Sequence, residues 1–238
     1  MELSGRLQAV ADLVTEGLRV ADIGTDHGYL PVYLLNSGKC PKVIAMDINE
    51  GPLSRAKEHI DRMVCRGKAE VRLSDGMQEL RAGEVDSVVL SGMGGALMIR
   101  ILERGKATVD GLRECVLQPQ SEIERVRTWL LRERFVIVQE NMVEEDGKYY
   151  PMMKVIPRAA ACRDGISMHL DWTTAELRYG KLLLEKGHPV LQKYLLREQS
   201  LRQNLLRELK QQNERARMRS EELCQELAVI AEAISYEK

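Results

Sequence analysis

The sequence predicts an α/β fold built on a doubly wound parallel sheet, followed by a helical, coiled-coil-like part. Up to residue 157, short β-branched runs alternate with helical patterns, and this alternation is typical of a parallel sheet covered by helices. Beyond Pro157 the strand pattern stops, and residues 190–236 contain neither Gly nor Pro. The 238 residues therefore divide into a first domain of residues 1–157 and a helical domain of residues 158–238.

The first domain opens with the apolar run of residues 18–23, which predicts a strand followed by a glycine-rich turn. The further expected strands are residues 43–48, 70–73, 85–90 and 114–117, and the expected helices are residues 29–36, 52–64, 95–103 and 121–134. Ser121 is expected to cap the last of these helices, with Glu124 at the capping-box position. Residues 135–139 and 152–156 are the last two strands. Because a loop centred on Asp146-Gly147 separates them, we expect an antiparallel strand at one edge of the sheet.

In the second domain, residues 173–186 form the first expected helix, which ends at Gly187-His188-Pro189. Farther on, apolar, small and polar residues recur every three or four positions, as in the seam of a coiled coil. These residues are Leu209, Asn213, Ala216, Ser220, Leu223, Leu227, Ile230 and Ile234. A single helix over residues 190–236 would be roughly 70 Å long, so we expect a fold-back near residues 211–213 and an antiparallel helical hairpin. These repeating residues fit packing inside the hairpin or a contact between two copies of the chain. We expect a monomer or a weak dimer.

The composition excludes several classes of protein. The chain is 44% hydrophobic and 30% charged with a net charge of -1, so it can bury a core and is not a disordered chain. The five cysteines are widely spaced without a CxxC pair, so neither a disulfide framework nor a metal site is expected. Charges near the N-terminus argue against a signal peptide, and no apolar run is long enough to cross a membrane. We expect a soluble cytoplasmic protein.

The motif Asp22-Ile23-Gly24-Thr25-Asp26-His27-Gly28 follows the first strand. A glycine turn at this place lets the backbone approach a nucleotide-like ligand. The dinucleotide pattern G-x-G-x-x-G fails, because Asp26 stands where its second glycine would be. A carboxylate there disfavours a pyrophosphate and suits a ligand with positive charge, such as the sulfonium and ammonium groups of S-adenosylmethionine. The alternative is an ordinary tight turn between a strand and a helix.

Three further candidate motifs end the next three strands. Asp47 is placed to accept hydrogen bonds from ribose hydroxyls, or is a solvated acid at a strand end. Ser74-Asp75-Gly76 offers a carboxylate to an adenine amino group, or is a common Asp-Gly turn. Ser91-Gly92-Met93-Gly94-Gly95 leaves room for a ligand and an incoming base, or is a bare connecting loop. Because the four motifs end successive strands, together they favour one binding site.

These motifs, taken in order, resemble a known family. DIGTDHGYLP, MDIN, SDGM, SGMGG and LQPQ are similar to those of the bacterial tRNA adenine-N1 methyltransferases of the TrmK family, and the resemblance covers nearly the whole chain. It implies a Rossmann-like class I methyltransferase domain that uses S-adenosyl-L-methionine and releases S-adenosyl-L-homocysteine. It also implies methylation of N1 of the adenine at tRNA position 22, with the coiled-coil-like domain helping to hold the tRNA.

The resemblance implies roles for individual residues. Gly24, Asp26 and His27 would line the methionine side of the cofactor. From the chemistry, Asp26 is the candidate for an electrostatic role in catalysis, and His27 positions the cofactor, contacts the base or is a plain structural histidine. The expected cofactor-binding residues are Gly24, Asp26, His27, Asp47, Ile48, Asp75, Gly76, Gly92 and Met93, with Gly94 near the target base. Apart from the resemblance, Arg6 either reaches the cofactor carboxylate or is a solvated charge on a helix face.

The near-zero net charge hides a segregation of charge along the chain. Residues 1–157 carry 21 basic and 24 acidic residues, residues 178–219 carry 11 against 4, and residues 220–238 carry 1 against 5. A basic helical stretch can follow phosphates without reading bases. The expected tRNA-binding residues are Lys193, Arg197, Arg202, Arg207 and Lys210. The alternative is a solvated helix face that pairs partly with the acidic last segment.

The expected chemistry asks little of the protein. Adenine N1 has an in-plane lone pair and carries no proton, so direct in-line displacement at the sulfonium methyl needs no general base. The base must leave its stack, because N1 lies on the Watson–Crick edge. Two other functions remain open from the sequence. One is a methyltransferase acting on a small molecule or a protein, and the other is a helical scaffold protein that uses a degenerate nucleotide fold.

Overall fold

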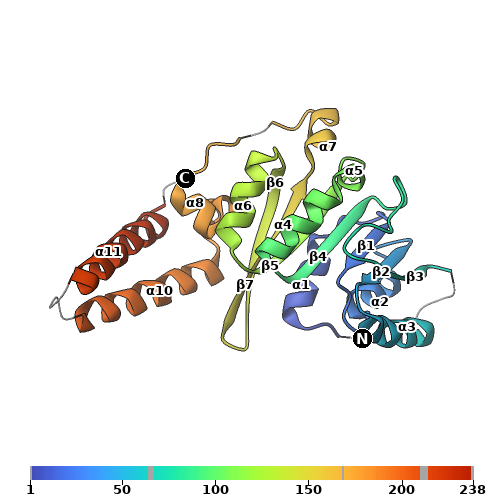
Figure 1. Cartoon of the computed structure of the whole chain (residues 1–238), viewed down its shortest axis with the longest axis horizontal. Helices are drawn as coiled ribbons and strands as arrows, with labels where there is room; N and C mark the ends of the chain where they lie inside the picture. The colour runs from blue at the N-terminus through green and yellow to red at the C-terminus, as the bar shows by residue number, and fades with distance from the viewer. Residues whose placement is uncertain (1, 64–66, 168, 210–213, 237–238) are drawn as a thin grey trace. The chain divides into compact units, whose positions relative to one another are not determined.

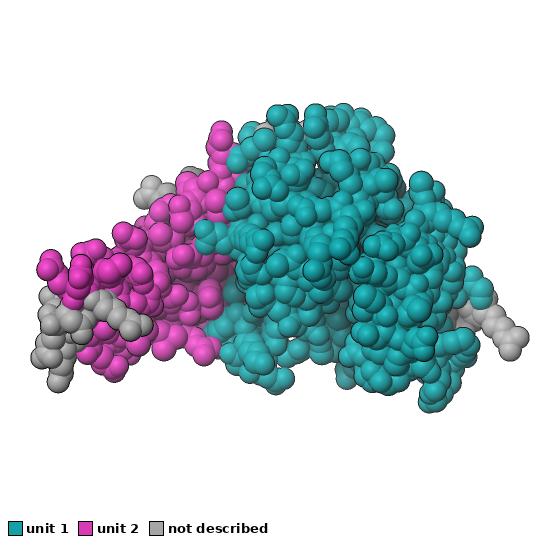
Figure 2. Space-filling model, in the orientation of Figure 1, with its two compact units in different colours: residues 1–170 teal, residues 171–238 magenta. Residues whose placement is uncertain are grey.

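The computed structural model describes residues 2–63, 67–167, 169–209 and 214–236. The chain forms two compact units, residues 1–170 and residues 171–238, which are coloured separately in Figure 2. The first unit holds all the strands among the described residues, together with the short helix α7 (Arg158–Arg163) that follows the last strand. Helices are the only regular elements in the described part of the second unit.

The first unit is built on a seven-stranded sheet with the order β3-β2-β1-β4-β5-β7-β6. The strands are β1 (Val20–Ile23), β2 (Val43–Asp47), β3 (Ala69–Leu73), β4 (Ser87–Gly94), β5 (Glu114–Ser121), β6 (Val136–Glu145) and β7 (Lys148–Ile156). The first five strands pair in parallel, and β7 is antiparallel to both of its neighbours. The doubly wound α/β prediction is confirmed for this unit.

Helices cover both faces of the sheet (Figure 1). One layer contains α1 (Gly5–Leu13), α2 (Tyr29–Asn36) and α3 (Glu50–Met63), and the opposite layer contains α4 (Gly95–Arg104) and α6 (Ile123–Arg132). The short helix α5 (Lys106–Val109) follows α4. The central strands β1 and β2 are buried almost throughout, which explains their unbroken apolar sequences.

Two local predictions for the first unit are wrong. Ser121 does not cap α6, because the pairing of β5 with β4 continues to Gly94 and Ser121 and keeps Ser121 in the strand. Glu122 takes the N-cap position instead, in a left-handed conformation (φ 52°) and without a side-chain capping bond. The antiparallel strand β7 lies between β5 and β6 rather than at the edge, because the returning strand of the hairpin pairs with β5.

The second unit contains four helices among its described residues: α8 (Thr174–Tyr179), α9 (Lys181–Glu185), α10 (Pro189–Glu208) and α11 (Glu214–Ile234). Thr173 forms a capping box with Glu176, and Gly180 (φ 97°) divides the single helix predicted for residues 173–186 into two. The helices α10 and α11 pack together as the predicted hairpin, and Leu223 and Ile230 are buried. The expected fold-back at residues 211–213 lies outside the described residues, and a coiled-coil geometry remains a prediction.

Candidate functional site

The four predicted motifs meet at the carboxyl edge of the parallel strands. The turn after β1 is fixed to the next strand, because the N–H groups of Gly24 and Thr25 donate to the carbonyl of Met46 at 2.7 and 2.8 Å. The turn after β3 is fixed in the same way, since the N–H of Ser74 donates to the carbonyl of Asp47 at 2.9 Å. These backbone bonds join the ends of β1, β2 and β3 into one continuous edge.

Gly24 and Met93 bring the ends of β1 and β4 into contact. Gly24 has a φ of 79°, and a Cβ atom at this position would lie 2.3 Å from the Cε of Met93. Only glycine therefore fits without a shift of the Met93 side chain. Two predicted cofactor-binding residues, distant in the sequence, thus lie side by side.

The expected catalytic pair, Asp26 and His27, lies on the surface of the glycine turn. The Asp26 side chain is 71% exposed, and its Oδ1 is 3.3 Å from Nε2 of His27 and 3.8 Å from Nη2 of Arg55. His27 adopts a φ of 57°, its carbonyl oxygen is 2.9 Å from Nδ1 of His59, and its ring stacks on Tyr29. The Asp26 carboxylate is therefore open to a ligand, while His27 is held by its neighbours.

Asp22 is a buried carboxylate for which the sequence motif predicted no role of its own. It lies in β1, two residues before Gly24, and is almost fully buried. Burial raises the pKa of Asp22 to about 6, and the charge of Asp47 adds to this rise. Its position as the first residue of the strand-end motif was the signal that could have identified it.

The other predicted cofactor-binding residues lie along the same edge. The Asp47 carboxylate accepts a hydrogen bond from the N–H of Asn49 at 2.8 Å, and Ile48 is 59% exposed. Asp75 pairs with Arg104 at 3.1 Å. Gly76 has a φ of 62°, and a Cβ atom there would lie 3.1 Å from the Ile101 side chain.

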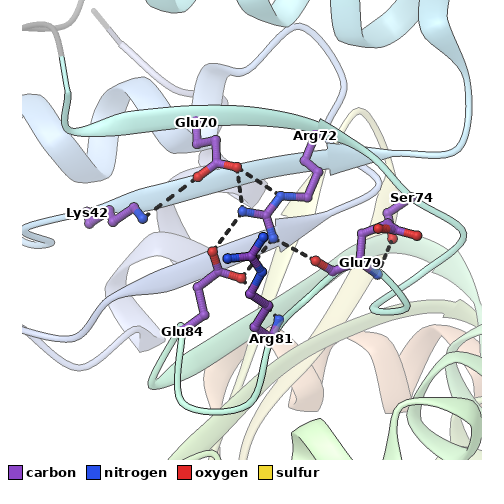
Figure 3. A network of polar contacts seen from close by, with 7 residues as sticks. All are labelled: Lys42, Glu70, Arg72, Ser74, Glu79, Arg81 and Glu84. Atoms are coloured by element: carbon purple, nitrogen blue, oxygen red, sulfur yellow. Dashed lines mark hydrogen bonds and ion pairs between the residues drawn. The ribbon is translucent and has the colours of Figure 1, made fainter.

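An ion-pair network fixes the segment that follows β3 (Figure 3). Arg72 lies between Glu70 and Glu84, and its Nη1 donates to the carbonyl of Glu79 at 2.7 Å. The N–H of Glu79 donates in turn to Oγ of Ser74 at 3.3 Å. The Arg72 guanidinium lowers the pKa of Glu84 to about 2. The network thereby holds the turn that carries Asp75.

Arg6 from α1 reaches the ends of β4 and β5. Its Nη1 lies 3.0 Å from Oε1 of Gln118 and 3.3 Å from Oγ of Ser91, and its guanidinium lies 5.6 Å from the centre of the Tyr150 ring. Of the two alternatives for Arg6, the solvated helix-face charge is wrong. Gln118 belongs to the LQPQ motif, for which the sequence suggested no role.

The expected tRNA-binding residues of α10 lie on two sides of the helix. Lys193, Arg197 and Arg207 are exposed, and they share one side because Arg197 is one turn and Arg207 about four turns beyond Lys193. Arg202 is about two and a half turns from Lys193 and lies on the opposite side, where it pairs with Glu198 at 2.6 Å and with Glu226 of α11. Lys210 lies outside the described residues.

Other candidate ligand sites are not built from the predicted residues. A cavity of about 620 Å³ lies between α4, α5, α6 and α7, and none of the expected cofactor-binding residues lines it. Within the described residues, no group of three or more His, Cys, Asp or Glu side chains could hold a metal ion. None of the described helices has the length and apolarity that a membrane span requires.

Comparisons with known proteins identify the fold and the family of the chain. Residues 3–153 match the family model for a methyltransferase domain. The chain is 33% identical to the tRNA (adenine(22)-N(1))-methyltransferase of Bacillus subtilis (strain 168), over 99% of this chain and 98% of the relative. It resembles a Streptococcus pneumoniae structure in complex with S-adenosyl-L-methionine, with 28% identity and a TM-score of 0.84 over 98% of this chain and 100% of that chain. It also resembles M. capricolum TrmK in complex with S-adenosyl-homocysteine, with 25% identity and a TM-score of 0.82 over 98% of each chain.

The sheet order, the strand-end site and the matched domain define a Rossmann-like methyltransferase that uses S-adenosylmethionine. The similarity to the Bacillus subtilis enzyme extends over nearly the full length of both chains. The chain belongs to the family of the tRNA (adenine(22)-N(1))-methyltransferases. The resemblance predicted from the sequence motifs is thereby confirmed.

Proposed function

We propose that this chain transfers a methyl group from S-adenosylmethionine to N1 of the adenine at position 22 of tRNA. The observation that carries the proposal is the similarity over 99% of the chain to a relative whose name specifies this reaction. The strand-end site supports the cofactor part of the proposal, because three glycines with positive φ and four carboxylates lie at one edge of the sheet. These are Gly24, Gly76, Gly92, Asp22, Asp26, Asp47 and Asp75.

The residues at this edge fit S-adenosylmethionine. A site with the exposed carboxylate of Asp26 and the buried carboxylate of Asp22 suits a ligand that carries a sulfonium and an ammonium group. When bound, this cofactor supplies a methyl group on an electrophilic sulfonium. We assign the methionine side to Gly24, Asp26 and His27. Asp47 and Ile48 would flank the ribose, Asp75 and Gly76 the adenine, and Gly92 and Met93 the reacting centre.

The chain contributes mainly orientation to the reaction. Adenine N1 carries no proton to remove, so we propose no general base. Holding two reactants in line can contribute about 7–11 kcal/mol to a reaction of this kind. We propose that the exposed carboxylate of Asp26 stabilises the positive charge of the methylated adenine, and that His27 positions the cofactor or contacts the base.

The helical hairpin of the second unit is the proposed tRNA-binding element. Its exposed cations Lys193, Arg197 and Arg207 would contact phosphates, which gives affinity without base recognition. Arg202 lies on the opposite side of α10 and pairs with two glutamates, one of them Glu226 of α11. We assign Arg202 to holding the hairpin together. We also propose a monomer or a weak dimer, and a cytoplasmic location that a tRNA substrate favours.

Methyl transfer to unfractionated bacterial tRNA, followed by nucleoside analysis, tests the function. We expect 1-methyladenine to accumulate, and we expect none on a transcript whose adenine 22 is replaced by guanine. Absence of 1-methyladenine from tRNA would overturn the proposal, and product on the guanine transcript would overturn the position. Calorimetry with S-adenosylmethionine is the companion measurement, since no binding would favour a non-enzymatic scaffold.

A further inference from the structure

A β-bulge interrupts the pairing of β4 and β5 at the site. Ser91 pairs with Gln118 and Met93 pairs with Pro119, so Gly92 is an extra residue without a partner in the ladder. Gly92 also has a φ of 81°, which glycine adopts without strain. The bulge turns residues 91–93 of β4 away from the regular strand, next to the proposed reacting centre.

The side chain of Gln118 replaces the missing ladder bond. Its Oε1 accepts a hydrogen bond from the N–H of Gly92 at 3.1 Å, and it also accepts from Nη1 of Arg6 at 3.0 Å and Oγ of Ser91 at 3.3 Å. Its Nε2 donates to the carbonyl of Pro119 at 3.1 Å, so both ends of the amide have partners. The residue is fully buried, so its amide cannot exchange these partners for bulk water.

We propose that Gln118 is a positioning residue for the methyl-transfer reaction. It joins three elements at one oxygen atom, namely Arg6 of α1, the bulge of β4 and its own strand β5. By accepting from Gly92, Gln118 fixes the direction of the segment that carries Met93. By accepting from Arg6, it also holds the Arg6 guanidinium beside the carboxyl edge of the sheet. This proposal rests on the proposed function, because the segment it holds is the one assigned to the reacting centre.

The size of the effect follows from the geometry. Gly92 is exposed, so water can satisfy its N–H when Gln118 is lost, and the cost in folding stability stays small. The direction of the bulge is then no longer fixed, and displacement of reacting groups by about 1 Å can lower turnover by about 100-fold. A positioning role therefore predicts a loss of turnover that exceeds the loss of stability.

The chain offers a matched control on the same strand. Glu114 lies at the amino end of β5, is buried, and joins β5 to β4 and to the segment that follows α1, at the opposite end of the strands. Its Oε1 accepts from the N–H of Thr15, just after α1, at 2.9 Å and from Oγ of Ser87 of β4 at 3.2 Å. Substituting Glu114 thus perturbs the same packing far from the proposed reacting centre.

The test compares Gln118→Met, Gln118→Glu and Glu114→Gln with the full-length wild-type chain. Methionine conserves the volume of Gln118 and removes the acceptor. Glutamate keeps an acceptor oxygen toward Gly92 and Arg6 but loses the N–H that donates to the carbonyl of Pro119. For Gln118→Met we expect kcat to fall about 10- to 100-fold, with the KM for tRNA little changed. Gln118→Glu should recover part of this loss, and Glu114→Gln should keep the wild-type kcat per folded molecule.

Three results would overturn the positioning role. They are a Gln118→Met kcat within about twofold of wild type, equal losses in the two Gln118 variants, and a loss in Glu114→Gln as large as in Gln118→Met. Folded fractions from circular dichroism correct every rate. If the wild-type chain forms no 1-methyladenine, the proposed function fails together with this inference; if it does and Gln118→Met is fully active, only the inference fails.

Discussion

Gly24→Ala tests whether the contact between the ends of β1 and β4 forms part of the cofactor site. The substitution has two costs that the structure separates. The first is backbone strain, because an L-residue at a φ of 79° costs about 1–2 kcal/mol. The second is steric, since the new Cβ would lie 2.3 Å from the Cε of Met93. Because that methyl group ends a flexible side chain, the second cost falls on the position of Met93 rather than on the fold.

Gly17→Ala isolates the first cost. Gly17 has a φ of 83°, and no atom lies within 4 Å of the position of its added Cβ. Both variants should lose about 1–2 kcal/mol of unfolding free energy, which lowers Tm by about 2–8 °C for a chain of this size. Calorimetric titration with S-adenosylmethionine should show about tenfold weaker binding for Gly24→Ala alone, equivalent to about 1.4 kcal/mol.

A second substitution sharpens this test. Met93→Ala in the Gly24→Ala background removes the atom that the new Cβ meets, so part of the lost cofactor affinity should return. The two positions would then show a coupling that distant sites do not show. Wild-type affinity in Gly24→Ala would refute the reasoning, as would an equal loss of affinity in Gly17→Ala.

Three further predictions follow from the pKa shifts and the charge pairs. The pKa of Glu84 is lowered from 4.5 to about 2, so the stability from its ion pair is complete above about pH 4.5 and is lost as the pH falls toward 2. Urea unfolding should show a decrease of at most about 3 kcal/mol that Glu84→Gln abolishes. Asp22 has a pKa raised to about 6, so calorimetry should show that affinity for the cationic cofactor increases as the pH rises through about 6 and that Asp22→Asn removes this dependence. Arg207→Glu should weaken tRNA binding and lower its salt dependence in filter-binding assays with Tm unchanged, whereas Arg202→Glu should lower Tm because it breaks pairs within the hairpin.

The position of the site could be predicted because it depends on local patterns. Short apolar runs define the strands, and the residues that end them must share one edge when the strands are parallel. The sequence therefore predicts that Gly24, Asp47, Asp75 and Gly92 share one edge, and in the structure they lie at or beside the carboxyl ends of β1, β2, β3 and β4. The glycines are informative for a further reason. A backbone position with a positive φ is usually occupied by glycine, so a glycine at a strand end indicates such a conformation.

The contacts between these elements could not be predicted from local patterns. Arg6 and Gln118 are 112 residues apart, and their contact depends on how α1 packs on the sheet. In the sequence, Arg202 looks like the other basic residues of α10. Its pairing with Glu226 depends on how α10 and α11 are aligned in the hairpin. Ser121 fits a helix cap by sequence, but the longer pairing of β4 with β5 decides its conformation.

The proposed chemistry accounts for which polar groups of the site are buried and which are exposed. Methylation of a ring nitrogen that carries no proton needs no group that removes one, and the most exposed acid of the site, Asp26, is accordingly not buried or tightly paired. The buried polar groups include two that fix the backbone, Gln118 at the bulge and the carbonyl of Met46 at the glycine turn, beside the buried carboxylate of Asp22. A reaction limited by orientation depends on groups that fix the backbone, such as Gln118. A stronger acid or base cannot correct an error in the position of the base or the methyl group. We therefore expect the buried contacts that set backbone direction to matter more to turnover than any single titratable side chain.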